Sequence, residues 1–150
     1  MPLKNTNLIP SVCKIFFAPL SDINAISSTT DRFHRYVEFV DGRSWQQMYF
    51  TQGTAEFSEK SKDTESGEII EQSLKFIFPG EDENNLASLD AIVGRPLAVK
   101  IQYSSGLMKL MGDVGNGVKL AQVNQISAKA SGSQMEFSCM AAIRACWITP

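Results

Sequence analysis

Alternation of large apolar side chains with small or polar ones over residues 97–103 is the feature that most constrains how this chain folds. Leu97, Val99, Ile101 and Tyr103 fall on one face, and the residues between them fall on the other. Only a strand places every second side chain on the same side, so this segment predicts a half-buried strand. Weaker versions of the pattern recur between turn residues, over residues 12–17, 34–39, 45–50, 54–57, 69–78, 107–111, 118–126 and 135–143. The sequence therefore predicts a mainly β fold.

Two pairs of these strands are predicted to form hairpins. One pair joins residues 34–39 to residues 45–50 through a glycine-containing turn at 41–43. The other covers residues 97–111, with a Ser-Ser-Gly turn in the middle. Glycine and small polar residues favour such tight reversals. Residues 21–32 are rich in Ser, Thr and Asp and are predicted to be a loop with one short turn.

One amphipathic helix is predicted at about residues 83–93. Acidic and asparagine residues lie at its start, where the helix dipole favours negative charge. Leu86, Leu89 and Val93 recur at helical spacing, and Gly94 is suited to end the helix. The chain should therefore contain a single short helix among its strands.

The longest interruption of the apolar pattern is SEKSKDTESGE, residues 58–68, which are eleven residues without one apolar side chain. This segment bridges two predicted strands, so it must leave the core as a long polar hairpin. A solvated hairpin tip is the common form of such a connection, and an arm that becomes ordered against a neighbouring subunit is the alternative. The first ten residues, which contain Pro2 and Pro10, are predicted to be a flexible N-terminal arm.

The whole chain, residues 1–150, is expected to form a single β-rich domain. A content of 43% hydrophobic and 9% aromatic residues is enough for a sizeable core, and no repeat divides the sequence. The expected architecture is an antiparallel β-sandwich or barrel with one short α-helix.

The glycine-rich run GDVGNG, residues 112–117, could in principle hold a phosphate. A dinucleotide-binding loop requires a helix directly after its glycines, and a P-loop requires a closing Lys-Ser or Lys-Thr pair. Here a predicted strand follows from Val118. We interpret the run as a connection between strands, in which Asn116-Gly117 forms a turn with positive φ and Gly112 or Gly115 absorbs a bulge.

Charge and cysteine content argue against several classes of protein. The chain has 14 Lys and Arg against 16 Asp and Glu, a net charge of −2, so we expect no sequence-specific binding to nucleic acid. The chain has three widely spaced cysteines, Cys13, Cys139 and Cys146, and this odd, sparse set argues against a disulfide framework. The N-terminus lacks the apolar core of a signal peptide, and no apolar run has membrane-spanning length. We therefore expect folding in a reducing cytoplasm and no membrane partner.

No catalytic, cofactor-binding or metal-binding residue is predicted. His34 is the single histidine, and no Cys-x-x-Cys or His-x-x-x-His spacing is present. The carboxylates at 81–83 fit a helix start as well as they fit acid–base work. Trp45 and Trp147 each lie in a predicted strand with apolar neighbours, where core packing is expected. The chain is therefore expected not to be an enzyme, to need no cofactor and to bind no small molecule.

The order of the predicted parts resembles the tail-tube fold of long-tailed bacteriophages. Two stretches carry the resemblance: GTAEFSEKSKDTESGEIIEQSLKFIFPG is similar to the long polar hairpin of small phage structural proteins, and SSGLMKLMGDVGNGVKL is similar to their glycine-turned strand pairs. The resemblance is one of topology and covers roughly residues 11–148. Members of this superfamily, which includes tail-tube, tail-terminator and type VI secretion tube proteins, are β-sandwiches or barrels flanked by one helix, and they stack as rings.

This resemblance implies a self-assembling structural subunit of a phage or prophage tail. Its partners would be further copies of itself in a homo-oligomeric ring and other tail proteins. Its location would be the bacterial cytoplasm during assembly and the virion tail afterwards. A ring-forming protein needs exposed strand edges or arms, so the polar hairpin is the candidate subunit-contact arm. Its charged residues, of both signs and therefore suited to register-setting ion pairs, are Glu59, Lys60, Lys62, Asp63, Glu65 and Glu68.

A small ligand-binding or carbohydrate-binding β-barrel module is the alternative function, with Trp45, Tyr49 or Tyr103 as its platform. An enzyme ranks below both, because a base and a nucleophile are missing. The enzyme hypothesis would require a deep pocket around His34 with convergent polar groups.

Overall fold

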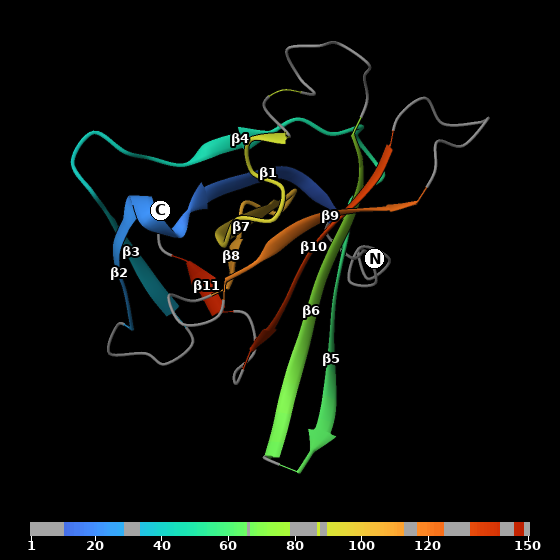
Figure 1. The fold of residues 1–150 in the computed structure, drawn as a ribbon. Coiled ribbons are helices and arrows are strands. Elements are labelled where there is room, and N and C mark those ends of the chain that lie inside the picture. The colour runs from blue at the N-terminus through green and yellow to red at the C-terminus, as the bar shows by residue number, and fades with distance from the viewer. Residues whose placement is uncertain are drawn as a thin grey trace, which may run out of the picture.

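Two β-sheets packed face to face make up the molecule (Figure 1). The computed structural model describes residues 11–28, 34–65, 67–78, 87, 90–112, 117–124, 133–141 and 146–148. The larger sheet has seven strands in the order β2-β3-β11-β8-β7-β1-β4. Its strands are β1 (Val12–Pro19), β2 (Ile23–Ser28), β3 (His34–Phe39), β4 (Gln46–Met48), β7 (Leu97–Tyr103), β8 (Met108–Met111) and β11 (Cys146–Ile148).

The smaller sheet has four strands in the order β5-β6-β10-β9. They are β5 (Glu56–Thr64), β6 (Gly67–Phe78), β9 (Lys119–Asn124) and β10 (Ser133–Ala141), and each pair of neighbours is antiparallel. The larger sheet is antiparallel as well, apart from the parallel pair β3 and β11. The predicted mainly β, antiparallel fold is confirmed, and it takes the form of a sandwich, since the sheets do not close into a barrel.

The main core lies between the two sheets and follows from the alternation in the sequence. Leu74, Phe76 and Phe78 of β6 and the odd-numbered residues of β7 point into it. Phe76 stacks on Phe137 of β10, with ring centroids 5.4 Å apart and planes 30° apart. Burial of these large side chains provides most of the driving force for joining the sheets.

A second, smaller core lies on the other face of the seven-stranded sheet. Its buried members are Ala18, Ile23, Ala98, Leu110 and Ile148, from five strands of that sheet. The sheet therefore curls around them, and the start of β7 is buried on both faces. The prediction that residues 97–103 form a half-buried strand holds only for the end of β7, where Lys100 and Gln102 are partly exposed.

The predicted hairpin between residues 34–39 and 45–50 is wrong. The turn itself exists: Gly42 has φ +82°, and the Arg43 amide donates to the Val40 carbonyl at 2.9 Å. However, β3 pairs with β2 and β11, whereas β4 pairs with β1 at the far edge of the sheet. A turn reverses the chain locally but does not decide which strands pair.

The predicted loop at residues 21–32 is wrong over Ile23–Ser28, which form β2, whereas the predicted short turn is present as the 3-10 helix η2 (Leu20–Asp22); residues 29–32 lie outside the described residues. Ile23 is buried in the second core, and Ile26 packs against it. Two apolar side chains that gain burial outweigh the turn-forming tendency of the surrounding Ser and Asn residues.

The short helix is present but minimal. Ala87 and Asp90 are helical, and the Ala91 amide donates to the Ala87 carbonyl at 3.1 Å. Residues 79–86 and 88–89 lie outside the described residues. The predicted end at Val93 is too late, because residues 91–94 form a turn in which Gly94 has φ +81°. Ile92, rather than Val93, is the side chain buried in the core.

The glycine-rich run 112–117 crosses from β8 in one sheet to β9 in the other, so it does not form a hairpin. Gly112 has φ +94°, but Gly117 is not among the described glycines with positive φ, so the turn predicted for Asn116-Gly117 is wrong at Gly117. Residues 113–116 lie outside the described residues. Directly after the run, Val118 and Leu97 exchange two backbone hydrogen bonds of 2.8 Å, which fix the corner between the sheets.

Candidate assembly surface

The polar segment found in the sequence is built as a β-hairpin that extends beyond the sandwich. β5 and β6 pair without a shift in register from Glu56↔Lys75 to Thr64↔Gly67. On the other side of β6, the last pair with β10 is Ala141↔Ile70. Residues 62–69, which we call the arm tip, therefore continue past β10, as the lower end of the green hairpin in Figure 1 shows.

The two lysines of the arm lie on its outer face, which points away from the larger sheet. Lys60 stands directly opposite Glu71 in the register, and the Lys62 ammonium lies 4.0 Å from the Glu71 carboxylate. The Lys62 and Glu71 side chains are well exposed, so this pair adds little to stability. Both lysines remain accessible to a partner.

The acidic residues of the arm gather at its end. Asp63 is directly opposite Glu68 in the register, and Glu65 lies in the turn. Like charges directly opposite one another in a β-ladder destabilise the pairing. All three carboxylates are exposed to water. The Thr64 hydroxyl donates to the Gly67 carbonyl at 2.6 Å and closes the turn.

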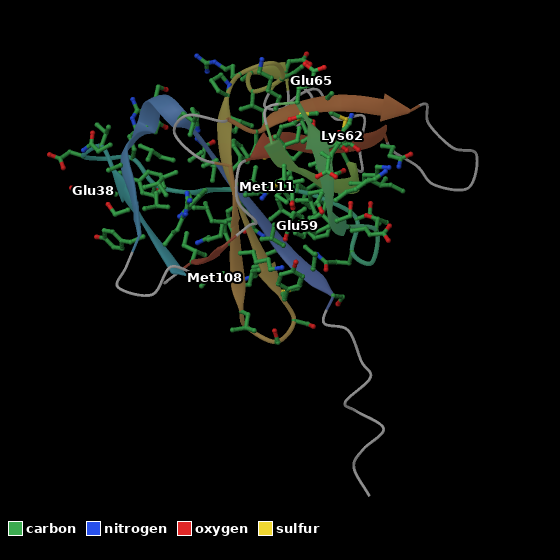
Figure 2. All side chains as sticks on the ribbon, turned by 90° about the horizontal axis from the view of Figure 1, so that it is seen from below. Glu38, Glu59, Lys62, Glu65, Met108 and Met111 are labelled. Atoms are coloured by element: carbon green, nitrogen blue, oxygen red, sulfur yellow. The ribbon has the colours of Figure 1, made fainter. Side chains whose placement is uncertain are left out.

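Glu59 does not share the surface of the other five arm residues. Its carboxylate lies 3.9 Å from the Lys109 ammonium of β8, and the Glu59 side chain is only 11% exposed. Figure 2, viewed towards the arm, shows Glu59 on the side facing β8, which Met108 and Met111 mark, with Lys62 and Glu65 farther away. The expectation that Glu59 belongs to the exposed contact set is corrected. Its position was visible in the sequence, because Glu59 falls on the same strand face as Phe57.

Several polar groups surround Glu59 between the sheets. Burial, assisted by the Glu59 charge, raises the pKa of the Tyr103 phenol. Burial also raises the pKa of the Cys139 thiol to about 11, although a hydrogen bond with the Gly112 backbone acts in the opposite direction. The Cys139 thiol donates to the side-chain oxygen of Gln72 at 3.1 Å, which gives the buried amide a partner. Cys13 and Cys139 are free thiols.

A shallow polar hollow of about 440 Å³ lies on the outer face of β5, β6 and β10. Ser58, Ser73 and Ser138 form one row across the three strands, with longer side chains in the rows on either side. The Ser73 hydroxyl donates to Glu136 at 3.0 Å, and Lys75 lies 3.9 Å from the same carboxylate. Ser73 and Lys75 therefore both contact Glu136 across the β6–β10 pair.

The aromatic residues of the alternative binding platform do not come together. Trp45 packs edge-on against Phe39 at 5.4 Å and belongs to the second core. Tyr103 packs against the main core, on the other side of the seven-stranded sheet. Tyr49 is 61% exposed beside β4.

Other residues singled out in the sequence are only partly described. The side chains of His34, Cys146 and Trp147 lie outside the described part of the structure, as do residues 1–10 and 81–83. Among the residues that are described, no group of three or more His, Cys, Asp or Glu side chains could hold a metal ion. No helix formed by these residues is both long enough and apolar enough to cross a membrane.

Comparison with protein-family models, with curated proteins and with solved structures gave no match.

Proposed function

We propose that this protein is a non-enzymatic structural subunit that self-assembles into a ring. The observation that carries the proposal is the four-stranded sheet, which ends in β5 on one side and in β9 on the other. No described strand pairs with the outer edge of either one. Unpaired strand edges bind other strands through backbone hydrogen bonds.

The direction of the strands favours a closed ring. All three pairs in the order β5-β6-β10-β9 are antiparallel, so β5 and β9 run in opposite directions. When identical subunits are repeated around an axis, β5 of one copy meets β9 of the next copy in antiparallel orientation. Such a head-to-tail contact continues the same sheet from copy to copy, and it forms a ring when the rotation between copies closes.

The arm tip adds a second contact in this proposal. Lys62 on its outer face, Lys60 on the same face just before the tip, and the carboxylates at its end present both signs of charge to a neighbouring copy. Charges at the edge of an interface fix orientation and register more than they add affinity. The lysines also oppose uncontrolled pairing of the β5 edge before assembly.

The particular assembly that fits best is a phage or prophage tail tube or a tail-associated ring. Support comes from the topological resemblance and from the sandwich with a long polar hairpin and a minimal helix. The partners are then other tail proteins, and assembly takes place in the bacterial cytoplasm before the subunit becomes part of the virion.

Solution mass and electron microscopy of the full chain test the proposal. We expect the mass to rise with concentration to a discrete ring that is visible by negative staining. A strict monomer at high concentration contradicts it.

An arm-trimmed variant tests the role of the tip. Lys62 and Ile69 are register partners of the same hydrogen-bonded type as Thr64 and Gly67, which flank the native turn, so Asn-Gly can replace residues 63–68 as a two-residue hairpin turn between them. We expect a folded chain that no longer forms rings, whereas the matched surface variant Glu38→Gln assembles normally. Rings that persist after trimming contradict a contact through the arm.

A further inference from the structure

We propose that Glu59 and Lys109 are positioning residues that fix the direction in which the arm leaves the sandwich. Lys62–Glu71 and Lys75–Glu136 are ion pairs within the four-stranded sheet. The 3.9 Å contact between Glu59 of β5 and Lys109 of β8 instead joins the two sheets. It lies at the root of the arm, where a small rotation of β5 becomes a large displacement of the tip.

Along β5, Glu59 is the last residue on the inner face whose side chain is mostly buried. Two residues earlier, Phe57 packs against the main core opposite buried Leu74. The next two residues on this face, Ser61 and Asp63, are both exposed. From Glu59 onward, therefore, no side chain of β5 is packed into the core.

Both partners of the ion pair are held in place. The Lys109 ammonium lies 5.4 Å from the centre of the Phe57 ring, a cation–π contact that restrains the flexible lysine stem. Glu59 stands opposite buried Gln72, which the Cys139 thiol ties to β10. The Lys109 side chain is only 24% exposed and that of Glu59 is 11% exposed, so water screens the pair less than it screens a surface pair.

The consequence for assembly rests on the proposed function. A rigid arm presents its charges in one orientation, so contact with a second copy requires little further ordering. An arm that swings loses this preorganisation, and the entropy of ordering it opposes association.

Distances within one chain test the inference directly. Spin labels are attached through p-acetylphenylalanine at Glu65 in the arm turn and at Leu107 in the turn after β7, which leaves the native cysteines untouched. Labelled protein is diluted with unlabelled protein so that only distances within one chain are read. We expect a narrow distribution for the wild type and for Lys109→Arg, and a broad or shifted one for Lys109→Met and Glu59→Gln. The exchanged pair Glu59→Lys/Lys109→Glu should recover the narrow distribution.

A narrow, unshifted distribution in both Lys109→Met and Glu59→Gln overturns the inference. Circular dichroism identifies variants that fail to fold, and the neutral, nearly isosteric Glu59→Gln is the variant least prone to do so. Rings are then counted by electron microscopy. If the wild type stays monomeric, the proposed function fails while the distance result still decides the role of the ion pair. If the wild type assembles, we expect fewer rings in the variants with a broad or shifted distribution.

Discussion

Gly117 lies against Pro96 so closely that a Cβ atom at position 117 would stand 2.6 Å from the Pro96 Cβ. The same atom would be 3.1 Å from the Leu20 side chain. The next residues, Leu97 and Val118, carry the backbone hydrogen bonds that join the two sheets at this corner. The glycine is therefore required for close approach of two chain segments, and not for a left-handed backbone.

Gly117→Ala should destabilise the fold. Either the proline segment moves or the corner between the sheets opens, and overpacking of this kind costs about 1–3 kcal/mol. The free energy of unfolding in urea measures the effect, with exposed Ser105→Ala as the control expected to stay within about 0.5 kcal/mol of the wild type. Equal stability of the two variants would show that the corner has room to relax.

Phe137→Ala should be among the most damaging substitutions. Phe137 is fully buried and stacks on Phe76, so its removal leaves a cavity between the sheets at a cost of about 3–5 kcal/mol. Met140 lies on the same strand but is 51% exposed. Met140→Ala should therefore change the free energy of unfolding by no more than about 0.5 kcal/mol. Chemical denaturation of both variants checks the contrast, and a small loss for Phe137→Ala would argue against this packing of the sheets.

Stability should fall at alkaline pH because of Cys139. Burial raises the pKa of its thiol from 9.0 to about 11, so the folded state holds this proton more tightly than the unfolded state does. The stabilisation of the folded state by this thiol proton is complete below pH 9 and is lost as the pH rises towards 11. The pKa of Tyr103 is raised as well, from 10.0, and acts in the same direction.

Cys139→Ser isolates the thiol, because serine can still donate to Gln72 but does not titrate in this range. The free energy of unfolding is measured from pH 7 to pH 11 in both proteins. We expect the decline between pH 9 and pH 11 to be shallower in the variant. Parallel curves would mean that the thiol titrates alike in the folded and unfolded chains.

Alternation in the sequence was sufficient to predict the strands that line the main core. β6, β7 and β10 each bury every second side chain over several residues, and a period of two has no other common explanation. β2 escaped prediction because its two burying residues, Ile23 and Ile26, are three apart and stand among serines. A register shift between Ile23 and Ala25 interrupts the alternation, so the two isoleucines reach the same core without a period of two in the sequence.

Neither the pairing of β3 and β4 nor the partner of the mostly buried Glu59 carboxylate could be predicted from the sequence. The turn at 41–43 predicted a hairpin, but β3 pairs with β2 and β11, whereas β4 pairs with β1 at the far edge of the sheet. Alternation from Phe57 places Glu59 on the inner face of its strand, but no sequence pattern reveals that Lys109 faces it from another sheet. The tail-tube resemblance and the assembly that it implies stay predictions.

Trimming of the arm tip should leave the fold almost unchanged in stability. Of the replaced residues 63–68, those that are described are exposed, and Ile70 keeps its place opposite Ala141 when Asn-Gly closes the hairpin between Lys62 and Ile69. We expect the free energy of unfolding of the monomer to change by less than about 1 kcal/mol. Urea denaturation at low protein concentration measures it, so that loss of assembly does not enter the comparison. A large loss would mean that the tip supports the sandwich, and the failure of the trimmed chain to assemble could then no longer be assigned to a missing contact.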